Sequence, residues 1–282
     1  TATYIIPNPE NLNIHAWLTL GVALLMACWW LTEAIPLPAT GLVPIVLFPI
    51  LGIKTIKQSV QGYSHPIIFL FMGGFIIGLA MQHTGLHKRI AYFIINQFKV
   101  STKLLILGFM IATAFLSMWI SNSATAIMML PIAISIITVF NENQNNIKNT
   151  NFAKALVLSI AFSATIGGVA TLIGTPPNTV MAAMLSELYN YEIDFLDWLI
   201  IGLPTAFILL PICWFILTYI CFPLNDKLDN NTNMIKNDMI KLGKITNDEI
   251  MVGIVFFITA CLWISRRWLS ELIENILPGS SL

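Results

Sequence analysis

Long stretches of this sequence carry almost no charge, and this feature limits the chain to a lipid environment. Only 10% of the residues are charged, whereas soluble domains carry about 25%. Several apolar runs reach the roughly 17–25 residues that a helix needs to cross the hydrocarbon core. Apolar segments are predicted at residues 14–31, 38–51, 66–84, 104–120, 124–140, 155–173, 178–186, 198–222 and 250–265. The sequence therefore predicts an all-α polytopic membrane protein.

The composition also excludes several classes of protein. The formal net charge is +0, so no nucleic-acid partner is predicted. The four cysteines lie inside apolar runs without CxxC or His pairing, which is typical of buried apolar side chains and not of a metal site. The serines near the polar breaks described below have no neighbouring Lys or His to activate a nucleophile, and no GxSxG motif is present. The chain is not predicted to be an enzyme.

Basic residues fall mainly on one predicted side of the membrane. With residues 1–13 outside and one crossing for each of the first three segments, residues 85–103 lie inside and suit an amphipathic helix on the membrane surface. If residues 104–140 return to the same side, connectors 141–154 and 223–249 are inside too. Ten of the fourteen basic residues are then inside, and four remain outside: Lys54, Lys57, Arg266 and Arg267. The loop 187–197, which is acidic and contains no basic residue, is also predicted outside.

The first polar break, Ser121-Asn122-Ser123, interrupts the uncharged residues 104–140. The arms on either side have about 16–18 residues, which is short for a full span. One interpretation is two spans joined by an outside turn. The other is a re-entrant hairpin whose tip stops inside the membrane, where irregular backbone must be buried in protein or line a wet cavity. Charge counting does not separate the two, because both return the chain to the same side.

The second break, Gly174-Thr175-Pro176-Pro177-Asn178, lies between apolar stretches that together make one crossing. Neither proline has an N–H to continue a helix, but proline is favoured in the first turn of a new one. A single proline would indicate a kink. This cluster instead predicts a broken helix over residues 155–186, and a second break in turn favours the hairpin interpretation of the first.

The two breaks together predict a binding site. Helices starting near Ala124 and Pro177 would direct their N-terminal N–H groups at the gap, and each helix start is equivalent to about half a positive charge. Freed carbonyls around residues 117–121 and at Gly174 suit a hard cation such as Na⁺. The site contains no Arg or Lys, so an anionic substrate would be held by helix ends, hydroxyl groups and a bound cation.

At these residues the chain resembles the divalent-anion/sodium symporter family, which carries di- and tricarboxylates or sulfate. The resemblance extends over nearly the whole chain. It rests on four motifs, which are LTEAIPLPAT (31–40), PIIFLFMGGF (66–75), FLSMWISNSATAIMMLPIA (115–133) and IGGVATLIGTPPN (166–178). The family pattern at the hairpin tip is Ser-Asn-Thr, and Ser123 here keeps the hydroxyl but lacks the methyl group.

The resemblance implies a set of site residues. The substrate carboxylate would meet Ser121, Asn122 and Ser123, with Thr175 and Pro176 beside it. A Na⁺ ion, which is the implied coupling ion, would be bound by Ser117, Ser121, Asn122 and Gly174.

The resemblance also implies an architecture of two inverted repeats, of which this chain is the first. Residues 1–103 would be scaffold helices plus the surface helix, and residues 104–222 the transport part. The transport part would comprise the hairpin 104–140, the broken helix 155–186 and the helix 198–222. A cytoplasmic loop, 223–249, would lead to residues 250–282, the truncated first helix of the second repeat. The parent would be a homodimer in the inner membrane that works by an elevator motion.

The function expected from sequence is therefore Na⁺-coupled symport of small dianions, with C4-dicarboxylates such as succinate favoured over citrate or sulfate. The fragment alone is expected to be inactive, since half of each binding surface would be absent. Two alternatives stay open. One is a sodium-independent dicarboxylate, citrate or sulfate exchanger, and the other is an anion channel that uses the same loops as a filter.

Overall fold

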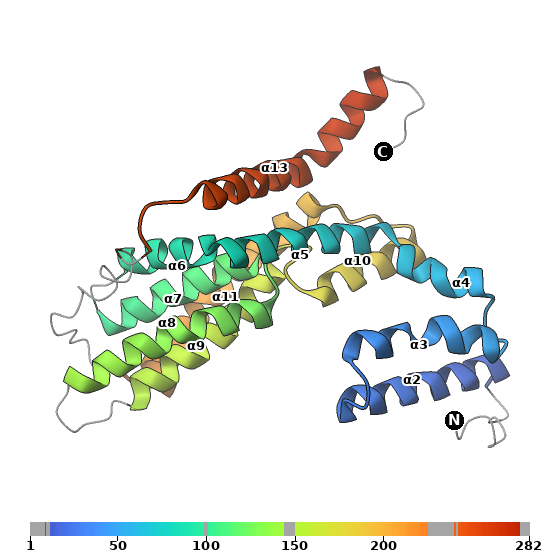
Figure 1. Ribbon diagram of the computed structural model, residues 1–282, viewed down its shortest axis with the longest axis horizontal. Helices are drawn as coiled ribbons and strands as arrows, with labels where there is room; N and C mark the ends of the chain where they lie inside the picture. Colours follow the sequence, from blue (N-terminus) through green and yellow to red (C-terminus); the bar gives the residue numbers. More distant parts are fainter. Residues whose placement is uncertain are drawn as a thin grey trace. The chain divides into compact units, whose positions relative to one another are not determined.

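The computed structural model describes residues 9, 12–98, 101–143, 150–224, 240 and 242–276. These residues form helices, turns, bends and short irregular segments, with no strand among them (Figure 1). The chain divides into two compact units, Thr1–Phe69 and Leu70–Leu282. The predicted all-α architecture is confirmed for the described part of the chain.

In the first unit, two apolar helices pack against each other: α2 (Ile14–Thr32) and α3 (Leu37–Ile50). The Asn13 side chain caps α2 by accepting a hydrogen bond from the His15 N–H at 3.1 Å. Capping of this kind satisfies one of the N–H groups that the first helical turn leaves without a partner.

A short segment after α3 folds back on it. The segment contains α4 (Ile56–Gln61) and the 3₁₀ turn η1 (Gly62–Ser64). The Tyr63 hydroxyl in this turn donates a hydrogen bond to the Gly41 carbonyl of α3 at 2.6 Å.

The second unit opens with α5 (Pro66–Thr84), most of which belongs to it, followed by α6 (Leu86–Gln97). Gly85 joins these helices with φ of 81°, a conformation that side chains with a Cβ rarely adopt. The amphipathic helix predicted in residues 85–103 is present as α6. Its buried face consists of Leu86, His87, Ala91, Tyr92 and Ile95.

Further helical segments follow, and the last of them is the long helix α13. They are α7 (Thr102–Ser117), α8 (Asn122–Asn143), α9 (Thr150–Val169), α10 (Pro176–Tyr189), α11 (Phe195–Phe215) with its π-helical extension η2 (Ile216–Cys221), and α13 (Asn247–Ile276). α9 packs extensively against both α7 and α8, and the three helices lie side by side in Figure 1.

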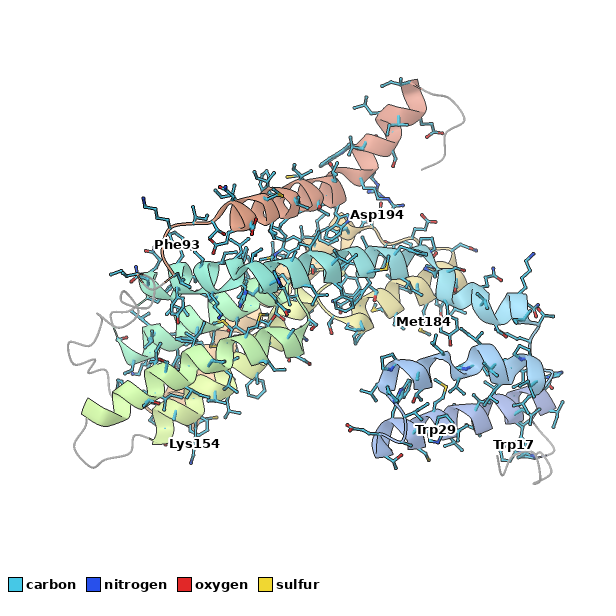
Figure 2. The ribbon with its side chains drawn as sticks, in the orientation of Figure 1. Trp17, Trp29, Phe93, Lys154, Met184 and Asp194 are labelled. Carbon is cyan, nitrogen blue, oxygen red and sulfur yellow. The ribbon has the colours of Figure 1, made fainter. Side chains whose placement is uncertain are left out.

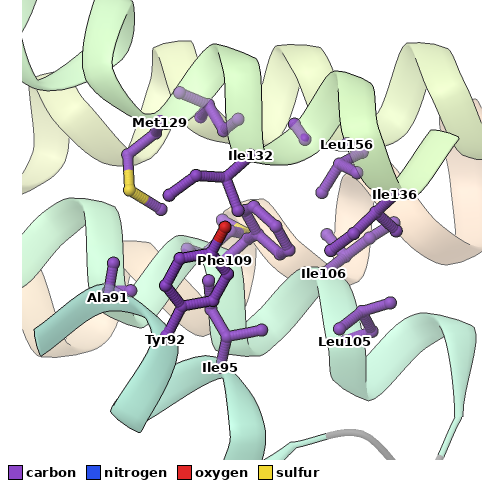
Figure 3. Close-up of a cluster of buried hydrophobic side chains, with 14 of the residues drawn as sticks. Ala91, Tyr92, Ile95, Leu105, Ile106, Phe109, Met129, Ile132, Ile136 and Leu156 are labelled. Carbon is purple, nitrogen blue, oxygen red and sulfur yellow. The ribbon is translucent and has the colours of Figure 1, made fainter. Parts of the chain in front are cut away.

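Apolar side chains of α6, α7, α8 and α9 interlock at the centre of the second unit (Figure 3). Phe109, Met129 and Leu156, from α7, α8 and α9, have no exposed surface. Lipid tails are as apolar as these side chains, so close packing and hydrogen bonds hold the helices together more than the exclusion of water does.

A buried ion pair joins α6 to the start of α13. Arg89 donates from Nε to Glu249 Oε1 and from Nη2 to Glu249 Oε2, both at 3.1 Å. Only 5% of the Glu249 side chain is exposed. The same guanidinium donates to the carbonyls of Leu242, Gly243 and Lys244. One side chain therefore fixes both the helix start and the turn before it.

Exposed ion pairs join the C-terminal half of α13 to the start of α11. Arg266 and Arg267 lie 3.6–4.0 Å from the carboxylates of Asp194 and Asp197, and Figure 2 shows Asp194 beside α13. The charge pattern predicts all four of these residues outside. Arg89 and Glu249, in contrast, are both predicted inside. Each group of ion pairs thus joins residues of one predicted side, as the orientation requires.

Among the residues that the structure describes, five helices are long and apolar enough to cross a membrane, and they begin at Ile14, Pro66, Asn151, Phe195 and Asn247. α3, α7 and the apolar part of α8 (Asn122–Thr138) are shorter. With 14 residues, α3 is about 21 Å long, less than the roughly 30 Å hydrocarbon core. It is therefore shorter than the full crossing that the sequence predicts for residues 38–51.

Several helices start two or three residues earlier than hydropathy predicts. α11 begins at Phe195 instead of 198, and α13 begins at Asn247 instead of 250. The polar residues Asp194 and Thr246 precede these starts, and each belongs to a pair of reciprocal hydrogen bonds with the residue three positions on. Hydropathy does not register such caps. Most of the predicted loop 223–249, and residues 277–282, lie outside the described residues.

We expect Arg89→Ala to lower the stability of the full-length protein by about 3 kcal/mol, because the buried Glu249 carboxylate loses its partner. The measurement is the thermal unfolding midpoint in detergent. The double variant Arg89→Ala/Glu249→Ala should lose less than the sum of the single losses. Additive losses would contradict a direct pair.

Arg267→Ala is the matched control at the other end of α13. The Arg267 side chain is 58% exposed, so its ion pairs contribute at most about 1 kcal/mol. A loss equal to that of Arg89→Ala would contradict the distinction between a buried and an exposed pair.

Candidate functional site

The first break is a short turn between α7 and α8. α7 ends at Ser117, whose side chain is fully buried, and the chain turns through residues 118–121 before α8 begins at Asn122. Ser121 caps α8, since its carbonyl accepts from the Thr125 N–H at 2.9 Å and its hydroxyl from the Ala124 N–H at 3.4 Å. The helix therefore starts two residues earlier than the sequence predicts, and the amide of Asn122 lies in its first turn.

The second break separates α9 from α10. α9 ends at Val169, and α10 starts at Pro176 after Thr175, which has an extended backbone (φ −150°, ψ 143°). The buried side chain of Asn178 turns back and donates to the carbonyls of Gly168 and Thr171 at 2.9 and 2.8 Å. Asn178 thus satisfies carbonyls that the interrupted helix leaves free.

Hydrogen bonds and side-chain contacts bring the two breaks together. The Thr171 hydroxyl donates to the Met118 carbonyl. The Ser117 hydroxyl donates to the Ala164 carbonyl of α9 at 2.7 Å. Both bonds join the turn at the end of α7 to α9 or to the segment after it.

Glycines allow the approach of α9. A Cβ on Gly167 would overlap the backbone of Ala114 in α7, and a Cβ on Gly168 would overlap the amide of Asn122. Only a residue without a side chain fits between these groups. The two neighbouring glycines therefore set the distance between α9 and the turn.

The amide of Asn122 faces three oxygen atoms. They are Ser117 Oγ at 2.8 Å, the Ala164 carbonyl at 3.2 Å and the Gly174 carbonyl at 3.3 Å. With its nitrogen turned toward them, the amide donates to these acceptors. With its oxygen turned toward them, the amide accepts from the Ser117 hydroxyl at 2.8 Å, and its oxygen faces the Ala164 and Gly174 carbonyls without a hydrogen between them. The orientation of one amide therefore decides whether these atoms form a hydrogen-bond network or a cluster of oxygens.

The chemistry of these atoms suits a hard cation. The described residues contain no group of three His, Cys, Asp or Glu side chains that could hold a transition metal. Neutral hydroxyl, amide and carbonyl oxygens are ligands for hard cations.

The structure brings together only some of the residues predicted for the site. Ser117, Asn122 and Gly174 meet, and Ser121 caps the helix beside them. Ser123 and Pro176 are exposed and Thr175 is half-buried, and no side-chain hydrogen bond is recorded for these three within the described chain. The sequence missed the Ala164 carbonyl, the Thr171 hydroxyl and Asn178. Of these only Asn178 carried a signal, as the last residue of the second break.

Aromatic side chains support the turn from the side of α11 and α13. The Trp119 ring stacks on Phe195 of α11 at 6.2 Å between centroids and meets Phe256 of α13 edge-on at 4.8 Å. Phe195 in turn contacts Trp263 of α13 at 5.5 Å. The tip between α7 and α8 is thus packed against two helices besides α9.

Residues 1–276 match the model of the sodium:sulfate symporter transmembrane region. The chain belongs to this family. It is a multi-pass protein of the cell membrane, consistent with the five apolar helices of spanning length in the described part of the chain.

Curated relatives carry a more specific name. The chain is 42% identical over 272 residues to the sodium-dependent dicarboxylate transporter SdcS of Staphylococcus aureus (strain USA300), covering 95% of this chain and 52% of that protein. The SdcS proteins of strains bovine RF122 / ET3-1 and NCTC 8325 / PS 47 are 41% identical with the same coverage. The chain thus spans about half the length of the curated relatives it matches.

Gly168→Ala should destabilise the full-length protein by about 1–3 kcal/mol, because the new methyl group occupies the space of the Asn122 amide. The thermal unfolding midpoint measures this loss. Gly41→Ala in α3 is the matched control, since its Cβ would meet no atom within 4 Å. Alanine there should be neutral or slightly stabilising. Equal effects of the two substitutions would contradict the close contact at Gly168.

Proposed function

We propose that the full-length protein is a Na⁺-coupled symporter of small divalent anions, with C4-dicarboxylates such as succinate as substrates. The observation that carries this proposal is the convergence of Asn122 with oxygens from both breaks. The names of the relatives, sodium-dependent dicarboxylate transporters, support both the cation and the substrate class.

The Na⁺ site consists of Ser117, Ser121, Asn122 and Gly174, and the Ala164 carbonyl joins them. Ser117 and Gly174 each place an oxygen within 3.3 Å of the Asn122 amide, as Ala164 does. Binding turns the amide oxygen toward these atoms. The orientation of the Asn122 amide then depends on whether the ion is bound. With the ion bound, the amide nitrogen is free to donate a hydrogen bond elsewhere.

The substrate site lies beside the ion, at the starts of α8 and α10. Ser121, Asn122 and Ser123 meet one carboxylate, with Thr175 and Pro176 next to it. Each helix start offers N–H groups without helical partners and a partial positive charge, which suit an anion. The exposure of Ser123 and Pro176 supports access from outside the packed helices. Because the site has no fixed positive charge, it binds a dianion strongly only when Na⁺ is also bound. This requirement couples the binding of the dianion to the binding of Na⁺.

Helix lengths support a re-entrant hairpin. α7 has 16 residues and is about 24 Å long, shorter than the hydrocarbon core. In this proposal α7 and α8 enter the membrane and return, and α9 and α10 together form a discontinuous transmembrane helix. The irregular backbone at both breaks is then buried in protein, as the membrane interior requires.

The proposal extends to the whole transporter. Residues 1–103 serve as scaffold and residues 104–222 as the moving transport part of an elevator. The loop 223–249 is cytoplasmic, and residues 250–282 begin a second, inverted repeat that supplies the other half of the site. This chain by itself does not transport, and the complete protein is a homodimer.

Succinate counterflow in proteoliposomes of the full-length protein tests the function. We expect labelled succinate to accumulate with Na⁺ and not with choline, and Asn122→Ala to reduce Na⁺-dependent uptake to background. Asn190→Gly is the matched control. Asn190 is an exposed residue with φ of 51° that ends α10, and glycine tolerates that conformation.

Three outcomes would contradict the proposal in different ways. Uptake unchanged in choline would indicate a sodium-independent exchanger. A linear current without counterflow would indicate an anion channel. Wild-type Na⁺ dependence in Asn122→Ala would remove Asn122 from the site.

A further inference from the structure

One buried hydroxyl group at the hairpin tip has no hydrogen-bond partner. Thr125 is fully buried in the first turn of α8, and its Oγ1 contacts no donor or acceptor among the described residues. Nine helical threonines elsewhere in the described chain donate to the carbonyl four residues earlier at 2.7–3.2 Å: Thr19, Thr32, Thr84, Thr113, Thr138, Thr165, Thr205, Thr218 and Thr259. The Thr125 hydroxyl does not form this hydrogen bond. Thr179 donates to the carbonyl three residues earlier, and Thr40 is a second helical threonine without a partner in that part of the chain.

A buried polar group without a partner destabilises a protein, so its presence needs an explanation. Four buried side-chain atoms lack a partner within the described residues, and two of them, Trp119 Nε1 and Thr125 Oγ1, lie at this one turn. Asn122, between them in sequence, has an amide that bonds to the Ala164 and Gly174 carbonyls only with its nitrogen turned toward them. Unmatched polar atoms are therefore concentrated at the tip.

Helix geometry places Thr125 beside Asn122. Residues three apart share a helix face with about 5–6 Å between their Cβ atoms. The Asn122 amide on this face points to Ser117, Ala164 and Gly174, where oxygen atoms outnumber donors. A single hard cation bridges two oxygens on such side chains, since its bonds to oxygen are about 2.3–2.6 Å for an ion like Ca²⁺.

The geometry points to Thr125 as a further oxygen ligand of the coupling cation, one helical turn beyond Asn122. This inference rests on the proposed Na⁺-coupled function. It explains why a hydroxyl is kept where the helix gives it no partner. The orphan hydroxyl of Thr40 in α3 is different, because it is the one such atom described in Thr1–Phe69 and no other unmatched group accompanies it.

Thr125→Val and Thr125→Ser separate a ligand from a structural hydroxyl. Valine keeps the shape of threonine and removes the oxygen, whereas serine keeps the oxygen. The readout is the thermal unfolding midpoint of the full-length protein titrated with NaCl against choline chloride, because an ion that binds the folded state raises the midpoint. In choline, Thr125→Val should unfold at or above the wild-type temperature, because it removes an unpaired polar group. In Na⁺, it should need about tenfold more ion for half of the shift, and Thr125→Ser should stay near wild type.

Thr113→Val provides the matched control. Thr113 is also fully buried in the hairpin, but its hydroxyl donates to the Phe109 carbonyl at 2.7 Å. Its valine variant should unfold at a lower temperature in choline and keep the wild-type half-saturating Na⁺ concentration. In choline, Thr113→Val is therefore expected to lower the unfolding temperature and Thr125→Val is not. Only Thr125→Val is expected to raise the half-saturating Na⁺ concentration.

Two results would overturn the inference. A wild-type Na⁺ titration in Thr125→Val would show that the hydroxyl does not contact the ion. A lower unfolding temperature of Thr125→Val in choline would show that the hydroxyl has a structural partner, such as a buried water. Failure of the proposed function looks different, since the wild type itself would then show no Na⁺-induced shift and no Na⁺-dependent uptake.

Discussion

The close approach of α9 to the turn between α7 and α8 is the contact on which the candidate site depends. Gly167 and Gly168 leave no room for a Cβ, so the Ala164 and Gly174 carbonyls come within 3.3 Å of the Asn122 amide. In lipid there is little hydrophobic drive between helices, and small residues are the usual means by which backbones approach closely. The polar chemistry of the two breaks thus follows from a packing feature one turn away.

The neutrality of the site follows from the same constraint. A lysine or arginine among these carbonyls would be costly inside the membrane, about 2.5–3.5 kcal/mol on insertion scales. Charged residues instead lie at the ends of the helices, where Arg89 holds the start of α13 and Asp194 meets Arg266 and Arg267. The fixed charges therefore organise the helix ends. The central site is left to neutral oxygens and N–H groups, which a mobile cation can complete.

Much of this arrangement was predictable from sequence. The features that were not predictable have identifiable physical reasons. The absence of charge and the prolines at 176 and 177 mark both breaks, and the family resemblance names Ser117, Asn122 and Gly174 together. The Ala164 carbonyl belongs to the backbone, so the residue type at this position does not indicate its role. The pair of Arg89 with Glu249 joins residues 160 positions apart, and a single sequence does not reveal such contacts. The start of α8 depends on the Ser121 cap, which hydropathy ignores.

The central claim is that one Na⁺ ion joins the two breaks through the Asn122 amide. The most direct measurement is a pair of high-resolution structures of the full-length protein, one prepared in Na⁺ and one in choline. The account predicts density for an ion among Asn122 Oδ1, Ser117 Oγ and the Ala164 and Gly174 carbonyls in Na⁺ only. It further predicts that the amide nitrogen takes the place of the oxygen in choline. The same amide orientation in both, with no density between these oxygens, would contradict it.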